Sequence, residues 1–301
     1  MELKLKDKHV RDLFWLIASP SPIKEYGVKG LPLLPSLIQN NWVTENTDFF
    51  IQLDADPSAL HAFLKERTST RLGIYAEFLL HYFFEHSPYI QLILHNYQVI
   101  ENKQTIGEVD FVIEYKGNIM HIELAVKYYL DTQQNDLLEH WIGPSGNDNL
   151  YKKIERVVTH QLPLGSSPMF RKQTKIYATS YFWLRGVFFT NTTKEVSWKN
   201  PKANFGRFYT FNELPNEMII NSNHKVLQRP HWMMDTKVSI DTMDDRHSFE
   251  LPDSMEEVQE LINIHGALLV KCLETSNLFF IVSDEWTESY VSSTLPESIP
   301  D

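Results

Sequence analysis

The stretch Gly107-Glu108-Val109-Asp110-Phe111-Val112-Ile113, followed by His121-Ile122-Glu123-Leu124-Ala125-Val126-Lys127, decides the fold of this 301-residue chain. Both segments have the composition of β-strands. The residues Lys116-Gly117-Asn118 between them are typical of a tight turn. The sequence therefore predicts an antiparallel hairpin with the acidic residues on its two strands.

Alternate residues of a strand point to the same face, so Glu108 and Asp110 share one side of the first strand. Glu123, Ala125 and Lys127 share one side of the second strand. We therefore expect acids and a lysine on one sheet surface, which is how a two-carboxylate magnesium site with a nearby cation is built. A solvated antiparallel sheet has the same pattern, and the spacing alone leaves both interpretations open.

A helix is predicted upstream, over residues 71–84, where apolar residues occur almost all round and indicate a mostly buried position. Glu77 lies in its middle. A carboxylate in such surroundings is costly unless a cation or a hydrogen-bond donor meets it. Either Arg71 is that partner, or Glu77 belongs to a shared metal site.

A second, amphipathic helix is predicted downstream, over residues 150–162, with Pro163 at its end. A polar helix face is usually solvated, but a basic helix beside an acidic metal site can also hold a phosphate backbone. The residues of this face, which we treat as candidate substrate-binding residues, are Lys152, Lys153, Arg156, His160 and Gln161.

The expected order is a helix, three strands that begin with Gln91–Ile100, the basic helix, and a strand over 175–190. This order resembles the α-β-β-β-α-β core of the PD-(D/E)XK nuclease superfamily, which has a restriction-endonuclease-like fold. The resemblance implies an α/β fold with a mixed central sheet flanked by helices. It also implies that Glu77, Asp110 and Glu123 are catalytic acids that bind Mg²⁺ or Mn²⁺.

The lysine of that motif departs from the superfamily pattern. Ala125 stands where the motif lysine would be, and Lys127 follows two residues later. At roughly 3.3 Å per residue, the shift moves the lysine about 7 Å along the same strand face. We therefore expect Lys127 to be the catalytic lysine.

A closer resemblance covers nearly the whole chain. It is to a bacterial domain-of-unknown-function family, number 1853, which is grouped with the PD-(D/E)XK nucleases by fold, and in which the shifted lysine is the normal arrangement. The resemblance implies the fold rather than a reaction. The motifs that carry it are residues 10–20, 107–111, 122–130 and 141–144, Lys152 with Lys153, residues 160–162, and Pro230-His231-Trp232.

The composition is that of a chain able to bury a sizeable core, in one domain or one with a smaller appendage. Its one cysteine, Cys272, excludes an intramolecular disulfide and a multi-cysteine zinc site, and its apolar neighbours indicate a packed core thiol. No apolar run has the length of a membrane helix or the character of a signal peptide. We therefore expect a cytoplasmic protein with no membrane contact.

The formal net charge of −11 argues against a protein that coats nucleic acid in general. It does not exclude a nuclease, because a local basic patch beside the metal can bind the nucleic acid. Arg171, Lys172 and Lys175 either extend such a patch or form an ordinary solvated loop.

We expect three regions in the chain. Residues 1–67 are a helical region with a helix at 9–18, residues 68–190 are the nuclease-like core, and residues 191–301 are a C-terminal α/β extension packed on it. Within the extension, residues 255–273 are predicted to be a helix capped by Ser254, and residues 277–282 a strand. The end of the chain, from Ser292, is expected to be a loose tail.

These expectations favour metal-dependent hydrolysis of phosphodiester bonds in DNA or RNA. The alternative comes from a different class of protein: a non-catalytic binding or scaffold protein that retains a nuclease-like fold. The displaced lysine and the acidic surface favour the alternative.

Overall fold

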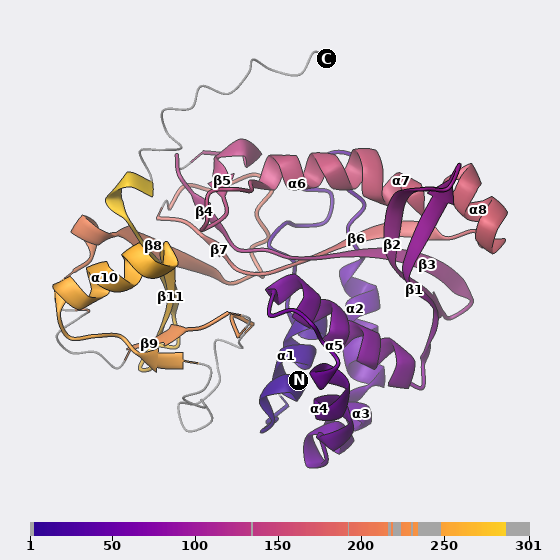
Figure 1. The fold of residues 1–301 in the computed structure, drawn as a ribbon, viewed down its shortest axis with the longest axis horizontal. Coiled ribbons are helices and arrows are strands. Elements are labelled where there is room, and N and C mark those ends of the chain that lie inside the picture. The colour runs from indigo at the N-terminus through magenta and orange to yellow at the C-terminus, as the bar shows by residue number, and fades with distance from the viewer. Residues whose placement is uncertain are drawn as a thin grey trace.

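The computed structural model describes residues 3–133, 135–191, 193–215, 218, 224–229, 231–233 and 248–286. Pro230 and the expected tail from Ser292 lie outside the described residues. The fold is mixed α/β, with helices on both faces of a central sheet and a second group of strands beside it (Figure 1).

The N-terminal helices form the layer below the central sheet in Figure 1. Their buried side chains join those of one sheet face in one apolar cluster, which includes Phe111, Ile122 and Trp183. The expected helices at 9–18 and 71–84 are both present. The bounds of the five helices are α1 (Lys8–Ala18), α2 (Ser36–Glu45), α3 (Thr47–Ala55), α4 (Ser58–Lys65) and α5 (Leu72–His86).

The central sheet has the order β1-β2-β3-β6. The pairs β1/β2 and β2/β3 are antiparallel, and β3/β6 is parallel. The predicted turn is confirmed: Lys116 and Gly117, with φ angles of 51° and 76°, join β2 to β3 as a two-residue hairpin. The strands are β1 (Ile90–Glu101), β2 (Gln104–Tyr115), β3 (Asn118–Val126) and β6 (Thr179–Arg185).

The opposite face of the sheet is covered by a chain of short helices, drawn above it in Figure 1. These are α6 (Leu150–Arg156), a π-helical turn (Val157–Gln161), α7 (Leu162–Leu164) and α8 (Pro168–Thr174). The prediction of one helix ending before Pro163 is wrong, because the helical path runs through the proline. Pro163 has no N–H for the carbonyl four residues earlier, and the neighbouring Leu162 N–H bonds Val157 O in the wider π pattern.

A second sheet has the order β10-β9-β11-β12-β8-β7-β4-β5. It joins the central sheet through a shared pair of strands, since β3 continues into β4 and β6 into β7, and both pairs are parallel. The predicted strand over 175–190 is thus β6 and β7, interrupted at Gly186. The bounds are β4 (Tyr129–Asp131), β5 (Trp141–Ile142), β7 (Phe188–Phe189), β8 (Phe205–Thr210), β9 (His224–Leu227), β10 (Ser248–Glu250), β11 (Ala267–Cys272) and β12 (Leu278–Val282).

The C-terminal helix is shorter than predicted. The helix α10 (Met255–His265) starts at the expected cap Ser254, but it ends at Gly266, whose φ of 74° suits a glycine. The apolar run that follows forms β11 instead of continuing the helix, and β12 matches the predicted strand at 277–282. The described residues also form 3₁₀ turns at Leu138–His140 and Phe211–Glu213. Among the described residues, no helix has the length and apolar character needed to cross a membrane.

The two faces of the central sheet differ in what they pack against. On β3, Ile122 and Val126 belong to the apolar cluster of the N-terminal helices, whereas Ala125 belongs to the cluster of Ile154 and Val157 in the helices above. Because side chains alternate along a strand, the residues at 121 and 123 face the α6–α8 side. The expected acidic face of β3 is therefore covered by the basic helix.

Candidate active site

The candidate site lies where β2 and β3 separate. Their backbone pairing runs from Tyr115 with Asn118 to Phe111 with Ile122 and stops there. At the next step the side chain of Asp110 replaces the backbone, because its Oδ2 accepts a hydrogen bond of 2.9 Å from Leu124 N. This places the Asp110 carboxylate in the fork between the strands.

Asp110 and Glu123 influence each other electrostatically across this fork. Burial and, to a smaller extent, the nearby charge of Glu123 together raise the pKa of Asp110 to about 8. Burial raises the pKa of Glu123 to about 7, against the attraction of the Lys153 ammonium. Two neighbouring carboxyl groups with raised pKa values are typical of functional sites.

Glu123 ends a chain of hydrogen bonds that runs into the protein. Its Oε1 lies 2.9 Å from Nε2 of His121, whose Nδ1 lies 2.9 Å from Ser180 Oγ. Ser180 donates its own proton to Leu162 O, so it accepts the proton on Nδ1 of His121. Burial lowers the pKa of His121 to about 4. The neutral imidazole thus offers the lone pair of Nε2 to a proton on Glu123.

The role of His121 in this chain of hydrogen bonds was not predicted from the sequence. The signal was present, because His121 precedes Glu123 by two residues and therefore shares its strand face. Ser180 had no such signal, since it comes from the neighbouring strand β6, where it pairs with His121.

Glu77 reaches the site from the α5 side of the sheet. Its Oε1 accepts hydrogen bonds from Nε2 of His95, at 3.2 Å, and from the amide of Asn96. These two residues replace Arg71 as the partners of the carboxylate, so the expected pairing with Arg71 is wrong. Consecutive strand residues normally point to opposite faces, but Asn96 has a φ of 49°, and both side chains meet Glu77. The charge of Glu77 also contributes to the raised pKa of Asp110.

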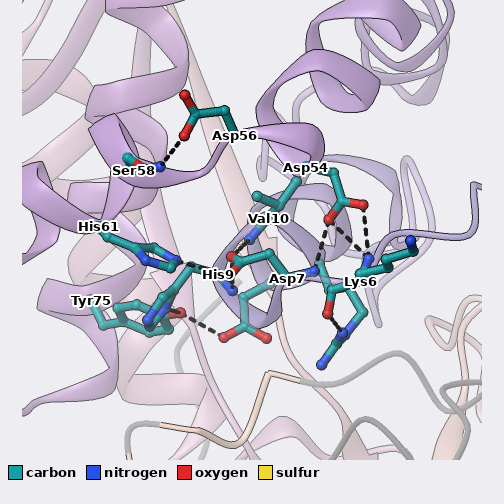
Figure 2. Close-up of polar contacts among 11 residues, drawn as sticks. Lys6, Asp7, His9, Val10, Asp54, Asp56, Ser58, His61 and Tyr75 are labelled. Carbon is teal, nitrogen blue, oxygen red and sulfur yellow. Dashed lines mark hydrogen bonds and ion pairs between the residues drawn. The ribbon is translucent and has the colours of Figure 1, made fainter.

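The helix α5 that carries Glu77 is fixed to α1 by a polar network (Figure 2). Tyr75 OH donates to Oδ2 of the buried Asp12 at 2.6 Å, and Nδ1 of His9 lies 2.6 Å from the same hydroxyl. His61 and Asp7 extend the network at 2.8 Å. Since Tyr75 is two residues before Glu77, these contacts hold the first turns of α5 in place.

The basic helix contributes to the site with only part of its polar face. Gln161 Nε2 donates to Oε2 of Glu123 at 2.6 Å, and its Oε1 accepts from Lys153 Nζ at 3.0 Å. The remaining expected residues of that face, Lys152, Arg156 and His160, are exposed to solvent. Glu108 is exposed as well, and its charge adds to the raised pKa of Glu123.

Lys127 lies just beyond the end of β3, where its backbone N–H still pairs with Arg185 O. Its ammonium donates to Oδ2 of Asp148, an oxygen that also accepts from Tyr129 OH at 3.0 Å. Asn149, the residue after Asp148, caps the following helix α6, because its Oδ1 accepts a hydrogen bond of 2.8 Å from Lys152 N.

The donors of this site fit a divalent cation held by two carboxylates. Among the described residues, no group of three or more His, Cys, Asp or Glu side chains has the arrangement of a metal site. Mg²⁺ does not need one, since it commonly binds through one or two carboxylates and completes its shell with water and substrate phosphate. Asp110 and Glu123 are the residues that would hold it, and a cation there would offset their mutual repulsion.

Other candidate residues lie elsewhere. A cavity of about 1290 Å³ is lined by residues of β8, β11 and β12, and its lining includes His224 and Cys272 but neither carboxylate of the candidate site. Cys272 is partly exposed at the end of β11, so its interpretation as a packed core thiol is wrong. Trp198 and Trp232 are buried packing residues.

The model of one protein family matches residues 11–280 of the chain; its description is domain of unknown function, DUF1853. No curated protein and no solved structure matches the chain. The comparisons thus leave the chemistry to be argued from the geometry of the site.

Proposed function

This chain belongs to the DUF1853 family, and we propose that it is a metal-dependent nuclease, with a PD-(D/E)XK core, that hydrolyses phosphodiester bonds in nucleic acid. The order α5-β1-β2-β3-α6-β6 and the sheet order β1-β2-β3-β6 support the assignment to that superfamily. The matching positions are Glu77 on α5, Asp110 on β2 and Glu123 on β3.

One observation carries the proposal: the buried Glu123 and the partly exposed Asp110 share the fork between β2 and β3, and the pKa of each carboxyl group is raised toward neutrality. Burial of two like charges is costly for folding unless a cation compensates it. The cationic helix face over the fork supplies the second requirement of a nuclease, which is attraction of a phosphate backbone.

A divalent cation at Asp110 and Glu123 would polarise the phosphate and lower the pKa of a water molecule. In the reaction, the water oxygen forms a new bond to phosphorus as the bond from phosphorus to one sugar oxygen breaks. One of the two carboxylates accepts the proton of the water, and the departing sugar oxygen takes a proton from solvent. The raised pKa values of Asp110 and Glu123 suit such a transfer near neutral pH.

The exposed basic and polar side chains beside the fork suit contact with the phosphate backbone on either side of the cut. Lys152, Arg156 and His160 follow one another along α6 and the π-helical turn and face solvent. Arg171, Lys172 and Lys175 are exposed too, on α8 and its C-terminal cap rather than in the loop considered as an alternative. These contacts carry no base recognition, so they suit DNA and RNA alike.

Cleavage of end-labelled single- and double-stranded DNA and RNA in Mg²⁺ and in Mn²⁺ tests the proposal. We expect the wild-type chain to cut at least one substrate, and Asp110→Asn to lower the rate at least about 100-fold. Glu114→Gln, at an exposed position of the same strand, is the matched control and should cut as the wild type does. Equal cutting by wild type and Asp110→Asn, or no cutting by a folded wild type, would refute the proposal.

A second candidate function is a binding or scaffold protein that keeps the fold without cutting. The closed hydrogen bonding of the site favours it, since Glu123 is held by His121 and Gln161, and Lys127 by Asp148. A scaffold should keep its fold and its partner when Asp110 and Glu123 are both replaced by alanine. A nuclease should lose Mn²⁺ binding and cutting in the same variant.

A further inference from the structure

We propose that Lys153, and not Lys127, is the catalytic lysine that contacts the phosphate at the site; this inference rests on the proposed nuclease function. The two lysines lie on the same side of the sheet, and their charges interact, because Lys127 lowers the pKa of Lys153. They differ in what each ammonium contacts, and that difference decides between them.

The charge of Lys127 is compensated by a carboxylate outside the fork. Its ammonium donates to Asp148, and both side chains are about one third exposed, at 32% and 34%. The strand geometry accounts for this position. β3 ends at Val126, and the backbone turns at the joint with β4, where Lys127 O lies against Gly186. A lysine paired with its own acid in solvent has little charge left for a phosphate in the fork.

Lys153 is partly exposed as well, but it lies on the sheet-facing side of α6, and its charge interacts with those of the two site carboxylates. Its Nζ is 5.7 Å from the centre of the Phe182 ring on the sheet below. Burial lowers its pKa, whereas the charges of Asp110 and Glu123 raise it. In turn, Lys153 is the leading positive charge that lowers the pKa of each of these two carboxyl groups.

The partner of Lys153 holds it in place without neutralising it. Its ammonium donates to Gln161 Oε1 at 3.0 Å, and the amide nitrogen of Gln161 donates to Glu123 at 2.6 Å. A neutral amide thus spaces the ammonium from the carboxylate. The π-helical turn ends at Gln161, so the change in helical pitch sets this bridge.

This arrangement is suited to the charge that develops during phosphoryl transfer. Negative charge grows on the phosphate oxygens, and a preorganised cation in a water-poor site stabilises it more than an exposed one does. Lys153 would also repel a divalent cation at Asp110 and Glu123, whereas Lys127, whose charge Asp148 offsets, would do so weakly. The two lysines can therefore be distinguished by activity and by metal affinity.

The experiment compares Lys153→Met with Lys127→Met as a matched pair, with Lys153→Gln as a second variant in case the first fails to fold. In the cleavage assay, we expect kcat to fall at least about 100-fold in the Lys153 variants and less than about 10-fold in Lys127→Met. In a calorimetric titration with Mn²⁺ alone, we expect the Lys153 variants to bind about 3- to 10-fold more tightly than the wild type, and Lys127→Met to stay within about twofold.

A larger loss of kcat in Lys127→Met than in the Lys153 variants would overturn the inference, and so would equal Mn²⁺ affinities in all the variants. If the folded wild type binds Mn²⁺ but cuts nothing, the proposed function fails and the catalytic role of Lys153 fails with it, while the affinities still show which of the two lysines lies beside the bound cation. If it neither cuts nor binds Mn²⁺, both proposals fall.

Discussion

At the scale of single residues, the site is governed by the cost of burying acids. Asp110 has a pKa of about 8 in the folded chain against an ordinary value of 3.8. The folded state therefore holds this proton more tightly than the unfolded state does. The resulting stabilisation is complete below about pH 4 and is lost as the pH rises toward 8.

The asparagine side chain in Asp110→Asn cannot ionise, so this variant should not lose stability in this way as the pH rises. Between pH 5 and pH 8 without divalent cations, we expect the wild type to lose roughly 3 to 4 kcal/mol more unfolding free energy than Asp110→Asn. Urea unfolding at several pH values measures this difference. The unfolding free energy of Glu114→Gln should depend on pH as that of the wild type does. The same pH dependence in the wild type and in Asp110→Asn would contradict the raised pKa of Asp110.

At the scale of elements, the joint between the two sheets fixes where Lys127 lies. Gly186 has a φ of 132°, and a Cβ there would be 1.6 Å from Lys127 O. Both the backbone conformation and the contact exclude any other residue without movement of the strands. The interruption between β6 and β7 is therefore required by the close approach of β3 and β6.

Gly186→Ala should lower the unfolding free energy by roughly 3 kcal/mol or more, because backbone of the shared strand pair must shift. Gly73→Ala is the matched control, since Gly73 is exposed in α5, and a Cβ there meets nothing within 4 Å. Thermal unfolding of both variants gives the comparison. A Gly186→Ala chain as stable as Gly73→Ala would show that the joint tolerates a side chain.

The elements of the central sheet could be predicted from the sequence because each has a strong local pattern. The alternation around Asp110 and the Lys116-Gly117 turn are examples. The run Ala267–Cys272 could not be assigned, because a short apolar segment fits a helix or a buried strand equally well. This run forms a strand because it pairs with β9 and β12, and the sequence does not reveal these pairings.

The candidate site was predictable in its acids but not in its cations. Strand alternation and the register that the Lys116-Gly117 turn sets between β2 and β3 bring Asp110 and Glu123 opposite each other. Which lysine meets them depends on the π-helical turn and on the joint at Gly186, both of which arise from packing between distant segments. On the polar helix face expected for residues 150–162, some side chains therefore point toward the site and others are exposed to solvent.

At the scale of the whole molecule, the region that ends with β7 and the C-terminal region are joined in one sheet. β8 pairs with β7, and the rings of Phe189 and Phe280, both fully buried, lie 4.7 Å apart. The residues up to 190 therefore depend on β8 and β12 for part of their core.

A chain cut after Thr190 should not unfold as a stable cooperative unit, because Phe189 and the edge of β7 would become exposed. Size-exclusion chromatography and thermal unfolding, each compared with the full chain, measure this. A monomeric truncated chain with a sharp transition would contradict the dependence and would make residues 68–190 part of an autonomous domain.

Asp110 and Glu123 are proposed to form one cation-binding centre. Calorimetric titration of Mn²⁺ into the wild type, Asp110→Asn, Glu123→Gln and Glu114→Gln tests this proposal. We expect binding to the wild type and to Glu114→Gln, with a loss of at least about 10-fold in affinity in each of the other two variants. Binding that survives in both, or a folded wild type that binds no Mn²⁺, would contradict it.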